Sequence, residues 1–442
     1  MKTKAKTINK NIEKNVEQIE NKESNKVTNE KGKPKSKETK KIKQIEGKQK
    51  IENKKEISTE KQQEVKIEEK ETKVENTKDE NNQKKKTPIL KKILITLITL
   101  MIIGATTILI LFYGPISTFR DWWITTAMTT MSHKYLAEWF FDDETINQVL
   151  DKNRIEETDE TTDTSLIVIM PNEQEKEEPE EKIEYANEYE KQLLAENLDK
   201  EKYNIYAEGE DYRIIKIKGN GYSGYLAAIY DPSKVKVATS KYIGRAGQYL
   251  TDMSKDNNAV ISINGGGFLD ENSKGNGSTP LGIVISNGKV IANNGNTVGG
   301  GLIGFDKENK LVIGKMSVEK AKSIGIRDAV TFAPFLIVNG EPVKIRGNGG
   351  WGSAPRTVIG QRQDGIVLFL VLDGRRLTMP GATIKDLIEI MQNYGAYNAA
   401  NLDGGTSSAM TYNHELVNDP VDASGNHRTR QIATSFIFTN DE

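Results

Sequence analysis

Polar side chains stand at the ends of apolar runs at several separate places in this sequence. Asn264 follows "AVISI", Arg356 follows "GSAP" and begins an apolar run, and Asp373 ends "IVLFLVL". Asn401 and Asp403 close "YNAANL" before two glycines and three hydroxyl residues. A charged side chain that closes a buried strand is costly unless it is paired or works on a ligand. Glycines beside it let a ligand approach the backbone. The pattern predicts a polar site assembled from strand ends.

Each of these residues, taken alone, also fits a structural role. Arg356 could pair with an aspartate as a buried salt bridge, and an aspartate before a glycine often caps a turn. Several such strand ends, all flanked by glycine, favour one shared ligand site over separate structural solutions.

Three other stretches match the consensus sequences of known binding or catalytic sites, but the residues or secondary structure around them do not fit those sites. "GNGYSG" at 219–224 fits a dinucleotide pattern, yet a strand-like run follows where that site needs a helix. The segment from Asp270 resembles the start of a calcium loop, but Lys274 takes a ligand position. "GGTSSA" around Ser407 approaches the elbow of serine hydrolases, but a strand follows it and His414 falls in a hairpin turn. All three sites are disfavoured.

Short apolar runs separated by turn signals must position the polar strand ends. Asn-Gly stands between apolar runs at 286–289 and 338–341, which predicts two hairpins. The expected strands are 212–218, 224–230, 234–239, 259–263, 281–286, 289–292, 311–314, 334–338, 356–361, 366–373 and 432–438.

Helices are fewer, and residues 383–394 carry the clearest helical pattern. Their apolar side chains recur at helical spacing, at Ile384, Leu387, Ile388 and Met391. Thr383 suits the N-cap. Two further helices are expected over 243–255 and 317–324. The fold class predicted for residues 184–442 is therefore α+β, a mixed, hairpin-rich β-sheet domain with a few packed helices.

The first 88 residues have the composition of a disordered, charged tail. They are almost entirely Lys, Glu, Asn, Gln, Thr and Ser, and they hold no aromatic residue. Over the whole chain 62 basic residues nearly balance 63 acidic ones, so the net charge says nothing about nucleic acid. We expect no nucleic-acid partner.

One segment predicts a membrane anchor. Ile93 to Tyr113 is a run of roughly 21 uncharged residues, about the length that crosses a bilayer. Lysines precede it, which places the N-terminus in the cytoplasm and the folded domain outside the cell. A cleaved signal peptide is disfavoured because the preceding region and the apolar core are both too long. We expect a single-pass membrane protein with its transmembrane helix over 89–114.

Two segments join this helix to the folded domain. Residues 115–153 are rich in Trp and Phe and predict a juxtamembrane helix, which either lies on the membrane surface or packs on the main domain or on another copy. Residues 154–183 are acidic and predict a linker. The chain has no cysteine, so it forms no disulfide or thiolate site, and we predict no cofactor and no metal.

The longest motifs resemble one enzyme family. "INGGGF", "APFLIVNGE", "APRTVIGQRQDGIVLFLVLDGRR" and "GATIKDLIEIMQNYGAYNAANLDGGTSSAMTYN" occur in the order found in phosphodiester glycosidases, the family of the lysosomal uncovering enzyme. The resemblance covers roughly residues 200–440, and the anchored tail is similar to membrane-bound bacterial members labelled exopolysaccharide-related. One position departs: the family reads LDGGGSS, and Thr406 replaces the third glycine.

The resemblance implies catalytic roles for three residues. Arg356 would grip the phosphate, because a guanidinium forks onto two phosphate oxygens. Asp403 would be the carboxylate that activates water or stabilises C1, and Asp373 its partner or a residue that orients Arg356. Both a retaining and an inverting mechanism fit. The substrate-binding residues implied are Asn264, Gly265, Gly266, Asn401, Gly404, Gly405, Ser407, Ser408 and Arg430.

The function implied is that of an extracellular hydrolase similar to N-acetylglucosamine-1-phosphodiester α-N-acetylglucosaminidases. It would cleave the C1–O bond of glycosyl phosphodiesters in a surface polysaccharide or wall polymer, which would be its partner. Two alternatives stay open: a non-catalytic protein that binds wall polymer, and a phosphodiesterase that cuts P–O with a metal on Asp373 and Asp403. The oligomeric state is left open.

Overall fold

The computed structural model describes the chain over residues 89–130, 133–169, 184–270, 275–295, 300–422 and 424–440. The predicted disordered tail over 1–88 and residues 170–183 of the predicted linker lie outside the described residues. The chain divides into two compact units, Met1–Thr99 and Leu100–Glu442, and helix α3 runs from the first into the second.

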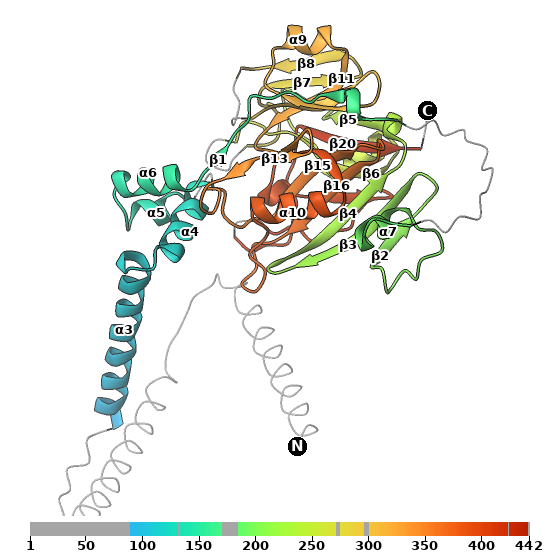
Figure 1. Cartoon of the computed structure of the whole chain (residues 1–442). Helices are drawn as coiled ribbons and strands as arrows, with labels where there is room; N and C mark the ends of the chain where they lie inside the picture. The colour runs from blue at the N-terminus through green and yellow to red at the C-terminus, as the bar shows by residue number, and fades with distance from the viewer. Residues whose placement is uncertain are drawn as a thin grey trace, which may run out of the picture. The chain divides into compact units, whose positions relative to one another are not determined.

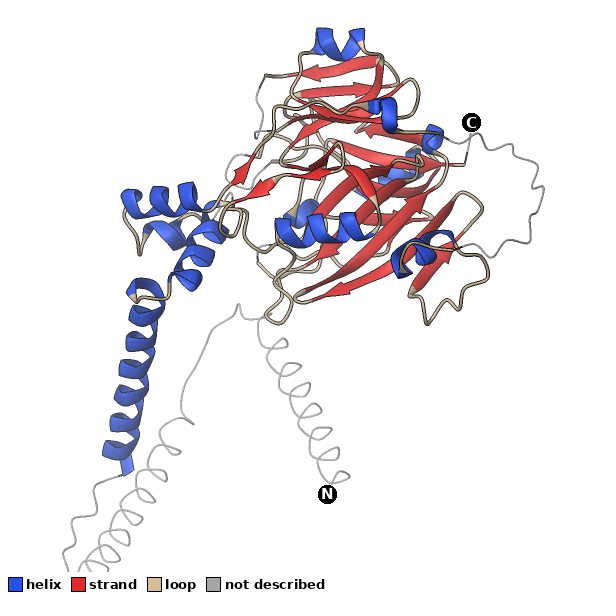
Figure 2. Cartoon of the chain, viewed as in Figure 1, coloured by secondary structure: helices blue, strands red, loops and turns tan. Residues whose placement is uncertain are grey.

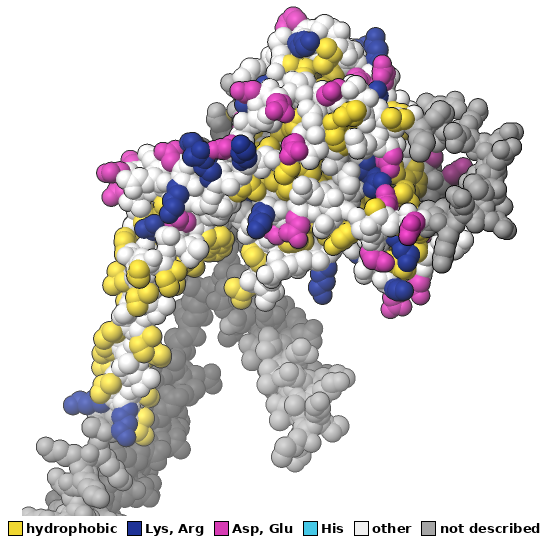
Figure 3. All heavy atoms as spheres, viewed as in Figure 1, with side chains coloured by type: hydrophobic (Ala, Val, Ile, Leu, Met, Phe, Trp, Pro, Cys, Tyr) yellow, Lys and Arg dark blue, Asp and Glu magenta, His cyan; other side chains and the backbone are white. Residues whose placement is uncertain are grey.

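Helix α3 spans Ile89–Tyr113 and is long and apolar enough to cross a membrane. Hydrophobic side chains cover most of its visible surface in Figure 3. Its threonines return their hydroxyls to carbonyls one turn earlier, for example Thr99 to Ile95 at 2.8 Å and Thr107 to Ile103 at 2.8 Å. The predicted apolar helix is therefore confirmed as a helix.

Three short helices follow α3 and share an apolar cluster. They are α4 (Ser117–Met128), α5 (Tyr135–Glu138) and α6 (Asp143–Lys152). Their cluster contains Phe112, Ile124, Ala137, Phe141, Ile146 and Val149. Asp142 caps α6 by accepting from the Thr145 amide at 2.7 Å. Sequence analysis expected a single helix in this segment, whereas the chain turns twice around this cluster.

The remaining chain is dominated by antiparallel strands, with helices at the edges and faces of the sheets (Figures 1 and 2). The helices are α7 (Glu188–Leu194), α8 (Leu250–Asp256), α9 (Val318–Ser323) and α10 (Ile384–Asn393), with 3-10 turns η1 (Thr164–Leu166), η2 (Pro232–Lys234) and η4 (Gly405–Ser407). The predicted helix over 243–255 is thus shorter, because "IGRAGQ" forms turns and a bridge from Gln248 to Ile432 before α8 begins.

The largest sheet has eight strands in the order β13-β12-β17-β15-β16-β4-β3-β2. Their bounds are β2 (Ile205–Glu208), β3 (Tyr212–Gly219), β4 (Tyr222–Ile229), β12 (Phe335–Val338), β13 (Glu341–Pro342), β15 (Arg356–Arg362), β16 (Val367–Asp373) and β17 (Ala396–Asn401). The strands β15, β16 and β17 are buried along their whole length or nearly so, since the sheet is covered on both faces.

Two five-stranded sheets complete the core. One has the order β19-β18-β6-β20-β5 and the other β10-β9-β11-β7-β8, while β1 (Ile155–Glu156) pairs with β14 (Lys344–Ile345). Their strands are β5 (Val235–Thr239), β6 (Ala259–Asn264), β18 (Met410–Tyr412), β19 (Glu415–Leu416), β20 (Thr434–Thr439), β7 (Ile283–Ser286), β8 (Lys289–Asn293), β9 (Gly301–Asp306), β10 (Leu311–Gly314) and β11 (Ile326–Phe332).

The local sequence signals explain several of these elements. Asn287 and Asn339 have φ of 50° and 56°, and they form the predicted hairpin turns β7–β8 and β12–β13. Thr383 forms a capping box with Asp386 at the start of α10, which packs its predicted apolar face on β12 and β17. The predicted α+β, hairpin-rich fold is confirmed.

Candidate active site

Asn264 connects two sheets at the centre of the site. It ends β6, and its Oδ1 accepts from Thr357 Oγ1 on β15 at 2.7 Å and from the Ala409 amide at 3.1 Å. Its Nδ2 donates to the backbone carbonyl of Asp403 at 2.6 Å. The side chain is fully buried and fully used. Asn264 therefore fixes the backbone from which the Asp403 carboxylate projects.

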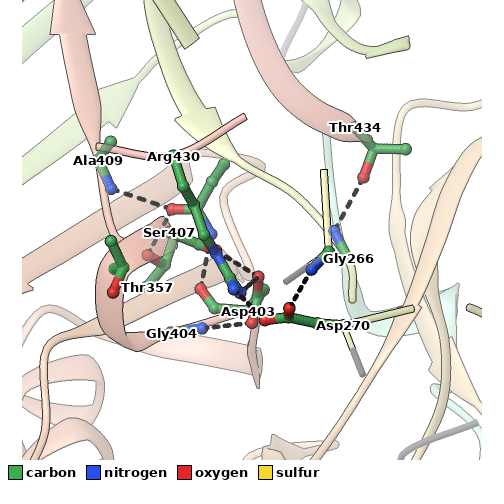
Figure 4. A network of polar contacts seen from close by, with 12 residues as sticks. Gly266, Asp270, Thr357, Asp403, Gly404, Ser407, Ala409, Arg430 and Thr434 are labelled. Carbon is green, nitrogen blue, oxygen red and sulfur yellow. Dashed lines mark hydrogen bonds and ion pairs between the residues drawn. The ribbon is translucent and has the colours of Figure 1, made fainter. Parts of the chain in front are cut away.

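The Asp403 carboxylate is held by groups from its own turn and from a distant arginine. Its Oδ1 accepts from the Gly404 amide at 3.0 Å. Its Oδ2 accepts from Ser407 Oγ at 2.5 Å and from Arg430 Nη2 at 3.2 Å. Figure 4 shows the carboxylate between the glycine turn and Arg430. These donors restrict the rotation of the carboxylate.

Arg430 bridges two carboxylates. Nη1 is paired with Asp270 and Nη2 with Asp403, while Nε donates to Ser407 Oγ at 2.7 Å. The guanidinium also lies 4.5 Å from the centroid of the Phe268 ring. Burial alone would lower the pKa of Arg430, but Asp403 and Asp270 outweigh burial and raise it. Arg430 is therefore fully engaged as a positioning group.

Arg356 is buried without a carboxylate partner. Only 4% of it is exposed, and Nη2 donates to the carbonyls of Trp351 at 2.7 Å and Gly352 at 2.9 Å. Its Nε donates to the Ala382 carbonyl at 3.2 Å. Burial, together with the nearby Arg375, lowers the pKa of Arg356 to about 10, so it is still protonated at neutral pH. Among the described residues no carboxylate forms an ion pair with Arg356, so the buried salt bridge considered as an alternative is not formed.

Arg375 is a second cavity arginine that sequence analysis missed. Its Nη1 donates to Thr406 Oγ1 at 2.6 Å and to the Val421 carbonyl at 3.3 Å, and no described acid forms an ion pair with it. Burial and the charge of Arg430 lower its pKa. Its backbone has φ of 60°, an uncommon conformation that often marks functional turns. The buried guanidinium of Arg356 and the partly buried one of Arg375 thus face the site, and neither forms an ion pair with a described carboxylate.

The side chains of Asp403 and of the three arginines line one cavity of about 1400 Å³. Of the predicted site residues, those that line it are Arg356, Asn401, Asp403, Gly404, Gly405 and Arg430. The Asn401 side chain is 1% exposed and donates to the Ala333 carbonyl at 2.8 Å. Its Oδ1 has no partner among the described residues. A buried acceptor without a partner is costly, and this Oδ1 is itself shielded from the cavity.

Comparison with known proteins supports the resemblance seen in the sequence. Residues 257–439 match the family described as phosphodiester glycosidase. This part of the chain is a phosphodiester glycosidase domain. A prophage-derived uncharacterized protein of Bacillus subtilis, YomE, is 29% identical over 203 residues, which is 44% of this chain. The chain spans 30% of that relative's length.

Solved structures of low sequence identity are also similar to part of this chain. The catalytic domain of zebrafish N-acetylglucosamine-1-phosphodiester α-N-acetylglucosaminidase, auto-inhibited by its pro-peptide, is 20% identical with a TM-score of 0.45. The match covers 52% of this chain and 83% of that domain. A hypothetical protein from Synechocystis is 15% identical with a TM-score of 0.34, over 51% of this chain and 62% of the other.

Other predicted site residues of the phosphodiester glycosidase domain lie behind the cavity wall. The Asp373 carboxylate accepts from Asn418 Nδ2 at 2.8 Å and from the Asp419 amide at 3.1 Å. Burial raises the pKa of Asp373. Its contacts therefore fix the chain at residues 418–419, and Asp373 is not among the cavity-lining residues.

The glycine pair after β6 and the two serines also stand outside the lining. The amides of Gly265 and Gly266 donate to the Thr434 carbonyl at 2.9 Å and to its Oγ1 at 3.0 Å, so neither amide is free for a ligand. A Cβ on Gly266 would lie 2.8 Å from the Thr331 carbonyl oxygen, which explains the glycine by packing. Ser407 holds Asp403, and Ser408 Oγ is buried without a described partner.

Sequence analysis missed three contributors to the cavity of the phosphodiester glycosidase domain. Asp270 lies in the segment considered only as a calcium loop, and Arg375 follows Asp373 in "DGRR". Trp122 of α4 lines the same cavity, although it precedes Asp403 by 281 positions. Within the described ranges, no group of three or more His, Cys, Asp or Glu side chains gathers as a metal site.

Proposed function

We propose that this protein is a membrane-anchored, extracellular hydrolase that cleaves the C1–O bond of glycosyl phosphodiesters in a surface polysaccharide or wall polymer. One observation carries the proposal. Two guanidinium groups without a described ion-pair partner, the buried Arg356 and the partly buried Arg375, line the same cavity as the oriented carboxylate of Asp403. The match to the phosphodiester glycosidase family supports the hydrolysis of a glycosyl phosphodiester as the reaction.

The phosphate of the substrate binds between Arg356 and Arg375. Each guanidinium uses part of its donors on neutral oxygens of the protein and keeps its charge for an anion. The two positive charges repel each other, and a phosphate diester bound between them offsets that repulsion.

Asp403 acts on the sugar carbon. A phosphate monoester is a good leaving group, so breaking C1–O needs little general-acid help. The requirement is a carboxylate near the oxocarbenium-like C1 that stabilises it or accepts a proton from the attacking water. Arg430 orients Asp403 for this role, and Asp270 on the opposite side of Arg430 keeps the guanidinium in place.

Asp373 is assigned a positioning role in this mechanism. Its contacts with Asn418 and Asp419 stabilise the turn that follows β19, and Arg375 lies two residues after Asp373 itself. Asp373 therefore supports the backbone that carries Arg375 rather than the reacting atoms.

The apolar helix α3 supports membrane anchoring. Lys91 and Lys92 near its start favour a cytoplasmic N-terminus, which leaves the hydrolase domain outside the cell. Surface polymers with glycosyl phosphates are then within reach.

A released-sugar assay with the full-length chain on glycosyl-phosphate-containing wall polymers tests this function. Wild type should release sugar with a free C1 hydroxyl, and Asp403→Asn should reduce the rate ~1,000-fold or more. Arg356→Ala should lower it by ~100-fold through lost phosphate binding. Polymer binding without turnover, retained in Asp403→Asn, would instead identify a non-catalytic wall-binding protein.

A further inference from the structure

The cavity has two chemically different walls. The phosphodiester glycosidase domain contributes the charged wall, with Arg356, Arg375 and Asp403. A second part of the lining comes from the helices that follow α3 and the turn between them, where Trp122, Trp123, Ala127 and Leu136 form what we call the apolar wall. Thr126, Thr129, Thr130 and His133 of the same segment also line the cavity. Of the described residues that α4, α5 and the turn between them add to the lining, none is an acid, a lysine or an arginine. The occupant that fits both walls is an amphiphile with a phosphate.

The apolar wall is attached to the phosphate site through one loop. Asn348 Nδ2 donates to Thr125 Oγ1 on α4 at 3.0 Å, and the Asn348 amide donates to Asn153 Oδ1 at 2.9 Å. The same loop accepts from Arg356 through the carbonyls of Trp351 and Gly352. The same loop therefore holds both helix α4 and the guanidinium of Arg356 in place.

The apolar wall also continues directly from the helix that we propose as the membrane anchor. Helix α3 ends at Tyr113 and α4 begins at Ser117. The Phe112 ring at the end of α3 lies 5.2 Å from the ring of Trp123, a residue of the cavity wall. Aromatic side chains at this position are favoured at the boundary between lipid and water. A cavity wall that continues from a membrane helix is placed to receive a hydrocarbon chain.

We infer that the substrate is a surface glycan joined through its C1 to a membrane lipid phosphate, with the hydrocarbon chain against the wall that includes Trp122. This inference rests on the proposed function. Water adds its oxygen to C1 and passes a proton to Asp403 and then to solvent. The C1–O bond breaks, and the lipid leaves as a phosphate monoester that keeps the bridging oxygen. The glycan is released with a free C1 hydroxyl.

Binding of the two product-like phosphates, geranylgeranyl phosphate and methyl phosphate, to the full-length chain in lipid nanodiscs tests the inference. Geranylgeranyl phosphate should bind at least roughly tenfold more tightly. Trp122→Ala should remove most of that preference, because Trp122 is 37% exposed and its loss leaves the apolar cluster of α4–α6 intact.

Trp139→Ala is the matched control. Trp139 belongs to the same helical segment and is 73% exposed, but it does not line the cavity. It should keep the preference for the long chain, since the nanodisc and α3 are unchanged. Equal binding of the two phosphates, or equal losses in Trp122→Ala and Trp139→Ala, would overturn the inference.

The experiments distinguish a failure of the lipid site from a failure of the proposed hydrolase function. If geranylgeranyl phosphate is preferred and the preference depends on Trp122, the lipid site stands even where no glycosyl phosphodiester is hydrolysed. If a methyl glycosyl phosphodiester is hydrolysed and no chain preference is found, the hydrolase stands and the lipid-linked substrate is wrong.

Discussion

Arg375 donates from Nη1 to the hydroxyl of Thr406 at 2.6 Å. Thr406 stands where the resembling family has glycine, and this contact shows what the added side chain does. It supplies an acceptor to a partly buried cavity arginine that forms no ion pair with a described carboxylate. The substitution thus restrains a phosphate-binding group.

The hydroxyl of Thr406 should therefore affect substrate binding more than turnover. Thr406→Gly frees Arg375 and should raise KM roughly three- to tenfold with a smaller change in kcat, because one hydrogen bond to a charged group is lost. Thr406→Ser keeps the hydroxyl and should behave like wild type. If Ser and Gly gave the same KM, the hydrogen bond would have no role in binding.

Binding of phosphate at Arg356 should raise the thermal stability of the protein. Inorganic phosphate in ~100-fold excess over its Kd should stabilise wild type by about 2.7 kcal/mol, measured as a rise in Tm. Arg356→Met should lose this rise, because the anion loses a buried guanidinium. Arg346→Met is the control, since Arg346 pairs with Glu156 and does not line the cavity. A phosphate-dependent rise that persists in Arg356→Met would contradict the assignment.

The lack of a side chain at Gly352 should be needed for α4 to pack against the loop that contains Gly352. Both Gly352 and Gly288 have positive φ, 57° and 71°, so alanine at either costs about 1–2 kcal/mol of backbone energy. A Cβ at Gly352 would lie 2.5 Å from Thr126 Oγ1, whereas nothing lies within 4 Å at Gly288. Gly352→Ala should destabilise more than Gly288→Ala, by about 1–3 kcal/mol.

Hydrogen exchange locates this effect. Amides of α4 should exchange faster in Gly352→Ala than in Gly288→Ala. Equal exchange in the two variants would mean that α4 does not depend on this contact.

Asp373 should make stability depend on pH in an unusual direction. Burial raises its pKa above the ordinary value of 3.8, so the folded protein binds this proton at higher pH than the unfolded chain. The buried charge costs stability above the folded pKa, and that cost is relieved as pH falls through it. Wild type should therefore gain stability relative to Asp373→Asn between about pH 7 and about pH 4.

Thermal unfolding of the two proteins at both pH values measures the difference. The asparagine keeps an oxygen acceptor for Asn418 and the Asp419 amide, so the fold should be retained. A difference in Tm that is the same at both pH values would show that Asp373 is not the group that titrates.

Residues whose partners are close in the chain could be predicted from the sequence. Asp403 stands at the end of a buried strand before its own capping glycines, and Arg356 begins a buried strand next to the loop that accepts from it. The helix α10 follows from its spacing and its Thr383 cap. Local patterns were sufficient in these cases because the interacting groups are neighbours in sequence.

Long-range pairings could not be predicted in this way. Asp270 meets Arg430 across 160 positions, and α4 reaches the cavity from far upstream. Asp373 was placed in the catalytic set because the sequence carries no sign that Asn418, 45 positions later, would occupy its carboxylate. A polar strand end looks the same in sequence whether its partner is a ligand or a distant loop.

The position of bond cleavage tests the central claim most directly. Hydrolysis of a glycosyl phosphodiester by the full-length protein in heavy-oxygen water should place the label on C1 of the released sugar, with none in the phosphate, and Asp403→Asn should abolish incorporation. Label in the phosphate would mean that the P–O bond breaks, and it would contradict the role of Asp403 as the carboxylate that acts at C1.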